Sequence, residues 1–270
     1  MTSDSGGRHV RSAFGDAKAF CAAMRAEGFR GFVVPSDGTF HAKLTQVALH
    51  GLNLSSIEET LPSISFIRVP GDTVLAAFAL NDRTRQIWGG CRLAANDLVL
   101  VGPGQSIHRR SEGASHWGLI WVQTRDLRDY SRSLLGKAIS IDSMDVWRLP
   151  AAVSRRLRAL QKSLVGAAHA RCMSLLHPQA VHGLEQQIID LLMEALSGTR
   201  RENRAEAWAR RQRLMALFEQ LPRSGGQTSL ARLCGALDLS EALLRRWCEE
   251  TLGMDPTRYA QLRSSQGGTN

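Results

Sequence analysis

The sequence predicts an α+β protein in which short antiparallel strands come first and helices follow. Between residues 31 and 122 the chain divides into short runs rich in Val, Ile, Leu, Phe and Thr. Turn signals separate these runs, such as Pro-Ser-Asp-Gly at residues 35–38 and Gly-Pro-Gly at residues 102–104. Many short strands at this spacing favour an antiparallel barrel or sandwich. From Thr124 onward the apolar residues recur at helical spacing, so we expect an N-terminal β-barrel followed by helices.

The N-terminal half is predicted to form one domain over residues 1–147. Residues 1–13 are polar and are expected to be loose, and a short helix is expected over residues 16–26. A further strand is expected to enter near Ile107, after the turn at residues 102–104. The other strands are expected at residues 40–50, 52–57, 64–69, 74–80, 97–101 and 117–122.

Helical spacing predicts three helices after the strands, at residues 126–135, 151–168 and 178–196. Residues 148–200 therefore form a helical connection between two domains, and the polar residues 197–203 are the best linker in the chain. An exposed apolar stripe on these helices would favour a homodimer. Packing of these helices on the β-domain is an equally good interpretation.

The C-terminal segment, residues 201–270, has the pattern of a helix-turn-helix domain. A first helix is expected at residues 204–221, and two short helices with a tight turn follow within residues 228–259. Ser240 supplies an N-cap oxygen, and Gly253 can end the second helix in the left-handed conformation. The apolar stripe of that helix consists of Leu243, Leu244, Trp247, Cys248 and Leu252.

This region resembles the first helix-turn-helix of the AraC family of transcription regulators. The residues that carry the resemblance are Leu230, Leu233, Ser240, Leu244, Arg246, Leu252, Gly253, Pro256 and Tyr259. Two positions depart from the family pattern, with Cys248 in place of a phenylalanine and Asp238 in place of a glycine in the turn. Members of the family continue into a second helix-turn-helix, whereas this sequence ends eleven residues after Tyr259. The DNA-binding domain is therefore expected to be truncated.

The resemblance implies a regulator with a cupin-like sensor domain at the N-terminus. The strand at residues 97–101, which runs into a Gly-Pro-Gly turn, is similar to such a domain. The implied partners are double-stranded DNA, a small-molecule effector in the barrel and a second copy of the chain. The identity of the effector and its binding residues stay open.

Helical spacing assigns candidate DNA-binding residues around the helix that begins after Ser240. Arg245 or Arg246 could donate two hydrogen bonds to a guanine. Arg232 and Ser240 are better placed to touch phosphate, which orients a protein without reading sequence. Glu241 and Ala242 lie on the same outer side, whereas Glu249 and Glu250 would repel phosphates. The candidate set is Arg232, Ser240, Glu241, Ala242, Arg245 and Arg246.

Composition is compatible with a DNA-binding protein but does not require one. The formal charge is +9, with a net of +2 in residues 1–147 (16 basic, 14 acidic) and +7 in residues 148–270 (18 basic, 11 acidic). A basic helical half is typical of a nucleic-acid reader, and a solvated Arg-rich surface explains it equally well. Five dispersed cysteines, no apolar signal-peptide core and no run of ~20 apolar residues predict a cytoplasmic protein that does not span a membrane.

Two other functions are compatible with the sequence. A truncated module that only dimerises or binds ligand is favoured by the early C-terminus. A metal-dependent cupin enzyme would need closely spaced histidines and a carboxylate, but His41, His50, His108 and His116 form no His-x-His pair, and Glu112 is the nearby carboxylate. We therefore predict no enzyme activity, no metal and no cofactor.

Overall fold

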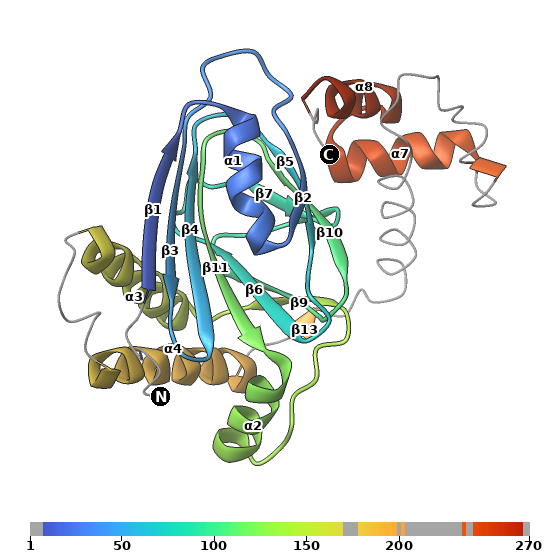
Figure 1. Cartoon of the computed structure of the whole chain (residues 1–270). Helices are drawn as coiled ribbons and strands as arrows, with labels where there is room; N and C mark the ends of the chain where they lie inside the picture. The colour runs from blue at the N-terminus through green and yellow to red at the C-terminus, as the bar shows by residue number, and fades with distance from the viewer. Residues whose placement is uncertain (1–7, 170–177, 199–200, 203–233, 236–239, 267–270) are drawn as a thin grey trace.

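The computed structural model describes residues 8–169, 178–198, 201–202, 234–235 and 240–266. The described part is α+β, as predicted, and is built in layers (Figure 1). Helices α2 to α4 cover one sheet, a second sheet packs against the other face of the first, and helices α7 and α8 lie beyond the second sheet. We call the first, eight-stranded sheet the large sheet and the second, five-stranded sheet the small sheet.

The large sheet is antiparallel and has eight strands in the order β1-β3-β4-β11-β6-β9-β12-β13. Its central strand β11 pairs with β4 on one side and β6 on the other, with Ser115 opposite Glu59 and Trp117 opposite Ala79. The bounds are β1 (Arg8–Phe14), β3 (Ala42–Ala48), β4 (Leu52–Glu59), β6 (Thr73–Ala79), β9 (Asp97–Val101), β11 (Ser115–Gln123), β12 (Met144–Arg148) and β13 (Arg201–Glu202).

The small sheet has five antiparallel strands in the order β2-β5-β10-β7-β8. Its strands are β2 (Phe29–Val33), β5 (Ile64–Arg68), β7 (Gln86–Trp88), β8 (Cys91–Arg92) and β10 (Ser106–Ser111). The expected closed barrel is therefore wrong, because the hydrogen-bonded pairing of the described strands stays within each sheet and the two sheets pack face to face as a sandwich. Bulky side chains such as Trp88 and Trp117 fill the space between the sheets and hold them apart.

Side-chain alternation gives the large sheet two buried faces. On β11, Trp117, Leu119 and Trp121 point into the sandwich, whereas Ile120 and Val122 point outward. Phe20 and Met24 of α1 (Ala17–Met24) complete the inner core from the side. Asp16 caps α1 by accepting a hydrogen bond from the backbone N–H of Ala19 at 2.8 Å.

The outer face of the large sheet carries three helices, α2 (Thr124–Leu135), α3 (Ala151–His169) and α4 (Pro178–Gly198). Val153 and Leu157 of α3 and Ile188 of α4 belong to the same buried cluster as Leu54 of the sheet. Of the two interpretations of these helices, packing on the β-domain is what the structure shows. The homodimer remains a prediction.

Several segments depart from the expected secondary structure, and strands β2, β7, β8 and β12 form where no strand was expected. Residues 8–13, expected to be loose, belong to edge strand β1, because backbone pairing with β3 compensates for a polar sequence. Residues 201 and 202, in the expected linker, pair with β12 as β13. The chain also continues past Tyr259 in the helix α8 (Pro256–Gln266). The helix expected at residues 204–221, and most of the helix expected to precede Ser240, lie outside the described residues.

None of the described helices is long and apolar enough to cross a membrane.

Candidate functional site

The helix α7 (Glu241–Leu252) forms as the sequence predicts. Ser240 is its N-cap and accepts a hydrogen bond from the backbone N–H of Leu243 at 3.3 Å. Gly253 ends the helix with φ +71°, a left-handed conformation that favours glycine. The residues Leu244, Cys248 and Leu252 are buried along one side, as expected from their spacing. This leaves the opposite side of α7 for a partner.

Five of the six predicted DNA-binding residues lie exposed at the N-terminal end of α7 or along its outer side. They are Ser240, Glu241, Ala242, Arg245 and Arg246. The sixth, Arg232, lies outside the described residues. An exposed helix side of this kind has the dimensions to enter a major groove.

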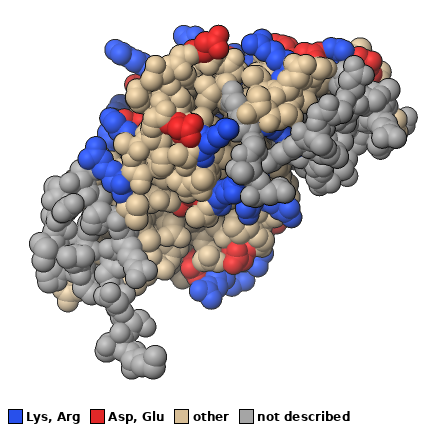
Figure 2. Space-filling view, turned by 45° about the horizontal axis from the view of Figure 1, so that its top comes forward, with Lys and Arg blue, Asp and Glu red and all other residues tan. Residues whose placement is uncertain are grey.

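The two arginines of α7 are both held by carboxylates. Arg245 donates from Nε and Nη2 to Oε1 of Glu241, at 3.0 and 2.7 Å, and from Nη1 to Asp255. Arg246 donates from Nε to Oε1 of Glu250 at 3.0 Å. The hydrogen bonds that Arg245 donates to Glu241 raise the pKa of Arg245, with a further contribution from the charge of Asp255. A base or phosphate contact by Arg245 therefore requires an exchange of partners. Over the face shown in Figure 2, basic side chains likewise lie beside acidic ones.

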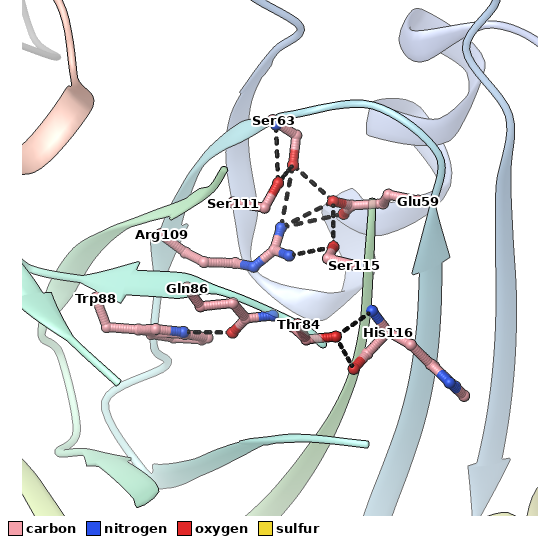
Figure 3. Close-up of polar contacts among 9 residues, drawn as sticks. All are labelled: Glu59, Ser63, Thr84, Gln86, Trp88, Arg109, Ser111, Ser115 and His116. Atoms are coloured by element: carbon pink, nitrogen blue, oxygen red, sulfur yellow. Dashed lines mark hydrogen bonds and ion pairs between the residues drawn. The ribbon is translucent and has the colours of Figure 1, made fainter. Parts of the chain in front are cut away.

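A second candidate site lies inside the sandwich, where Glu59 of the large sheet meets Arg109 of the small sheet (Figure 3). Both side chains are 0% exposed. Arg109 Nη1 lies 3.2 and 3.0 Å from the two carboxylate oxygens of Glu59. Burial lowers the pKa of Arg109, and the charge of Glu59 opposes that shift. The ion pair thus joins the two sheets through the interior.

Three serine hydroxyls complete this polar cluster. Ser63 and Ser115 donate to Oε2 of Glu59 at 2.6 and 3.1 Å. Ser115 also accepts from Arg109 Nη2 at 2.7 Å, and the hydroxyl of Ser111 accepts from the backbone N–H of Ser63 at 2.9 Å. Since Ser115 is directly opposite Glu59 on the neighbouring strand, strand register places these two side chains on one face. Both carboxylate oxygens of Glu59 therefore accept hydrogen bonds from protein groups.

Aromatic side chains form the floor of the cluster. The guanidinium carbon of Arg109 lies 3.9 Å from the ring centre of Trp117, a cation–π geometry. Trp88 packs edge-on against Trp117 and donates from Nε1 to Gln86 at 2.8 Å. Three buried N–H donors of the residues drawn in Figure 3 or packed beneath them have no acceptor among the described residues, namely Arg109 Nε, Trp117 Nε1 and Gln86 Nε2. Buried donors of this kind suit an oxygen acceptor from a water or a ligand.

Sequence reasoning did not assign this cluster, although a signal was present. Ile57 is an inward-facing residue on β4, and Glu59 follows it by two positions. Arg109 likewise follows the inward-facing Ile107 on β10. A period of two therefore places both charges inside an otherwise apolar core. Their mutual contact could not be predicted, because it depends on how the two sheets face each other.

The residues considered for a metal site are not brought together. His108 packs against Tyr259, on the side of the small sheet away from the sandwich interior, with ring centres 6.1 Å apart. Glu112 accepts two hydrogen bonds from Arg92, both at 2.6 Å. His116 Nε2 lies 3.1 Å from the hydroxyl of Ser56. Among the described residues, no group of three or more His, Cys, Asp or Glu side chains could hold a metal ion.

The fold has counterparts among solved structures. The crystal structure of the AraC-like transcriptional activator CuxR matches 94% of this chain and 93% of its own, with a TM-score of 0.50 and 14% identity. This chain has the fold of an AraC-like activator. At 14% identity, the similarity concerns the fold and says nothing of ligands.

Two further matches have TM-scores too low to support an argument. ToxT from Vibrio cholerae matches 79% of this chain and 99% of its own, at 7% identity and a TM-score of 0.33. Oxalate decarboxylase OxdC from Bacillus subtilis matches 35% of this chain and 30% of its own, at 12% identity and a TM-score of 0.24. Neither a protein-family model nor a curated protein sequence matches the chain.

Proposed function

We propose that the protein is an AraC-like transcription regulator that reads DNA with α7 and senses an effector through its β-domain. The observation that carries this proposal is the exposed side of α7, which presents Ser240, Arg245 and Arg246 on a fold shared with an AraC-like activator. The net charge of +7 in residues 148–270 gives long-range attraction to DNA. No enzymatic step enters this proposal.

On DNA, α7 would enter the major groove with its N-terminal end foremost. Arg245 would leave Glu241 and Asp255, and Arg246 would leave Glu250, so that one of them can donate to a guanine. Ser240, and Arg232 from the preceding segment, would contact phosphates. Two copies of the chain, if they dimerise, would address half-sites ~34–36 Å apart.

The effector is sensed, in this proposal, by the polar cluster of Glu59 and Arg109. Its unused N–H donors match a small molecule that carries oxygen acceptors. Because the ion pair joins the two sheets, an effector that competes for Arg109 would change how the sheets are held together.

A second function is favoured by the carboxylates around α7. With Arg245 and Arg246 neutralised by Glu241, Asp255 and Glu250, the exposed side of the helix has no excess of positive charge. The protein would then act as a dimerising or ligand-binding module without sequence-specific DNA binding.

Fluorescence anisotropy distinguishes the two functions. The purified protein is titrated onto DNA from upstream of its own gene and onto a scrambled duplex, across a salt series. The test variant is Arg245→Ala with Arg246→Ala. The control is Arg155→Ala with Arg156→Ala, which removes two adjacent exposed arginines from α3 instead. We expect a preference for the upstream DNA that the α7 variant abolishes and the control retains. Equal, weak binding of both duplexes by all three proteins would support the module.

A further inference from the structure

The outer face of the small sheet is occupied by α7 and α8 (Figure 1). Along β10, Ile107 and Arg109 point into the sandwich, so His108 and Arg110 point outward. Val33 of β2 and Ile64 of β5 also point outward and belong to the cluster formed with α7. The docking face thus comes from three neighbouring strands of the small sheet.

The apolar contact across this face is closely packed. Leu244, Cys248 and Leu252 of α7 are 0–1% exposed, and they share one buried cluster with Val33 and Ile64, which are each 1% exposed. Met254 and Tyr259 extend the cluster toward α8. The apolar stripe that a helix-turn-helix uses for its own core is therefore buried here together with sheet residues.

Two further contacts join the helices to the sheet. The ring of Tyr259 meets the ring of His108 edge-on, at 77° between the planes. A Cβ atom built on Gly253 would collide with the guanidinium of Arg110, so that arginine lies at the C-terminal end of α7. A cation is favourable at the negative end of the helix dipole. Burial lowers the pKa of Arg110, and the charges of Glu112 and, to a smaller extent, Glu249 of α7 oppose that shift.

We infer that the small sheet completes the hydrophobic core of the unit formed by α7 and α8. In this inference α7 is folded and oriented only while it is packed on the sandwich. The outer face formed by Val33, Ile64, His108 and Arg110 is then an intramolecular docking site for α7 and α8. Its role in DNA reading rests on the proposed function, whereas the docking itself does not.

The same arrangement connects the docking site to the polar cluster. Arg109 and Arg110 are consecutive residues of β10 that point to opposite sides of the small sheet. One holds Glu59 inside the sandwich, and the other lies at the end of α7. A shift of β10 that repositions Arg109 must therefore move Arg110, and with it the docking site of α7.

Hydrogen exchange of the full-length protein tests the docking. Ile64→Ala removes an outward side chain of β5, and Ile67→Ala is the matched control, because Ile67 is equally buried on the same strand but points inward. We expect Ile64→Ala to lower the protection of the α7 amides roughly 30-fold or more while β11 keeps its protection. Ile67→Ala should lower the protection of β11 as well. Arg110→Ala, a half-buried position, provides a second variant and should loosen α7 without harm to the sandwich.

The inference is overturned if α7 keeps its protection in both Ile64→Ala and Arg110→Ala. DNA binding by the same variants separates it from the proposed function. Loss of α7 protection together with loss of upstream-DNA binding supports both. Loss of protection with unchanged DNA binding supports the docking and contradicts DNA reading by α7.

Discussion

The guanidinium of Arg110 occupies the space that a side chain at position 253 would need. These two residues are far apart in the sequence, one on a strand of the small sheet and the other at the end of α7. Gly253 therefore combines a left-handed backbone, which favours glycine, with the close approach of an arginine from the sheet. The pair joins the β-domain to the proposed reading helix and can be tested from either side.

Gly253→Ala should destabilise the protein by about the cost of its left-handed backbone. The atoms that an added Cβ would meet first belong to the guanidinium of Arg110, the far end of a flexible side chain, which can move aside at little cost. Gly104 is the matched control, because its φ is also +71° but nothing lies within 4 Å of an added Cβ. We expect each substitution to cost about 1–2 kcal/mol in the free energy of urea unfolding. A clearly larger cost for Gly253→Ala, removed when Arg110→Ala is added, would contradict this expectation and show that Arg110 is held rigidly in place.

Removing the carboxylate of Glu59 should be far more harmful than removing its neighbour Glu58. Glu59→Ala leaves the fully buried Arg109 without a counter-charge, and loss of one partner of a buried ion pair costs about 3–5 kcal/mol. Glu58 forms an exposed pair with Lys43 at 3.3 Å, and such pairs contribute about 0–1 kcal/mol. Urea unfolding of Glu59→Ala and Glu58→Ala measures the difference. A similar loss in both would show that the buried pair does not hold the sheets together.

Asp255→Asn should strengthen DNA binding if α7 reads DNA. The substitution removes a negative charge beside Arg245 but keeps the side-chain oxygen that accepts from the backbone N–H of Thr257 at 2.8 Å. The start of α8 is thereby preserved. We expect affinity for the upstream duplex at low salt to rise about twofold to fivefold, measured by anisotropy. Unchanged or weaker binding, with α8 intact by circular dichroism, would argue against a role for Arg245.

The thiol of Cys248 should stay protonated and unreactive in the folded protein. Burial raises its pKa to about 12, and the charges of Asp255 and Glu249 add to the shift. Between pH 9 and pH 12 the folded state therefore binds a proton that the unfolded state has lost, so this group's contribution to stability falls as pH rises through that window. Cys248→Ala should weaken this dependence in urea unfolding measured from pH 8 to pH 10.5. Native labelling by a thiol reagent at pH 8 should reach half-buried Cys91 before Cys248.

Local patterns in the sequence were sufficient to predict the elements whose causes are local. Ser240 as a cap, Gly253 as a stop and the burial of Leu244, Cys248 and Leu252 follow from spacing and backbone preference, and the structure confirms them. Leu243 and Trp247, expected on the same stripe, are half-buried. Apolar runs between turn signals likewise located β9 and most of β6 and β11. Edge strand β1 was missed because its polar residues are held by pairing with β3, and no short-range pattern reports that pairing.

Contacts between distant segments could not be predicted from the sequence. Whether strands close into a barrel or stack as two sheets depends on pairing at the sheet edges. Asp255 beside Arg245 and Arg110 beside Gly253 depend on where α8 and the small sheet lie. Alternation could have placed Glu59 and Arg109 in the interior, but only the stacking of the sheets shows that they meet.

The pleat of β10 makes the length of this strand critical. Inserting or deleting one residue within it would reverse its faces, turning Arg109 toward α7 and Arg110 toward Glu59. A single such event would disrupt the interior ion pair and the helix contact at once, whereas a change of two residues would restore the parity. Natural variants of this chain should therefore vary in length in the surrounding turns and keep the number of residues within β10.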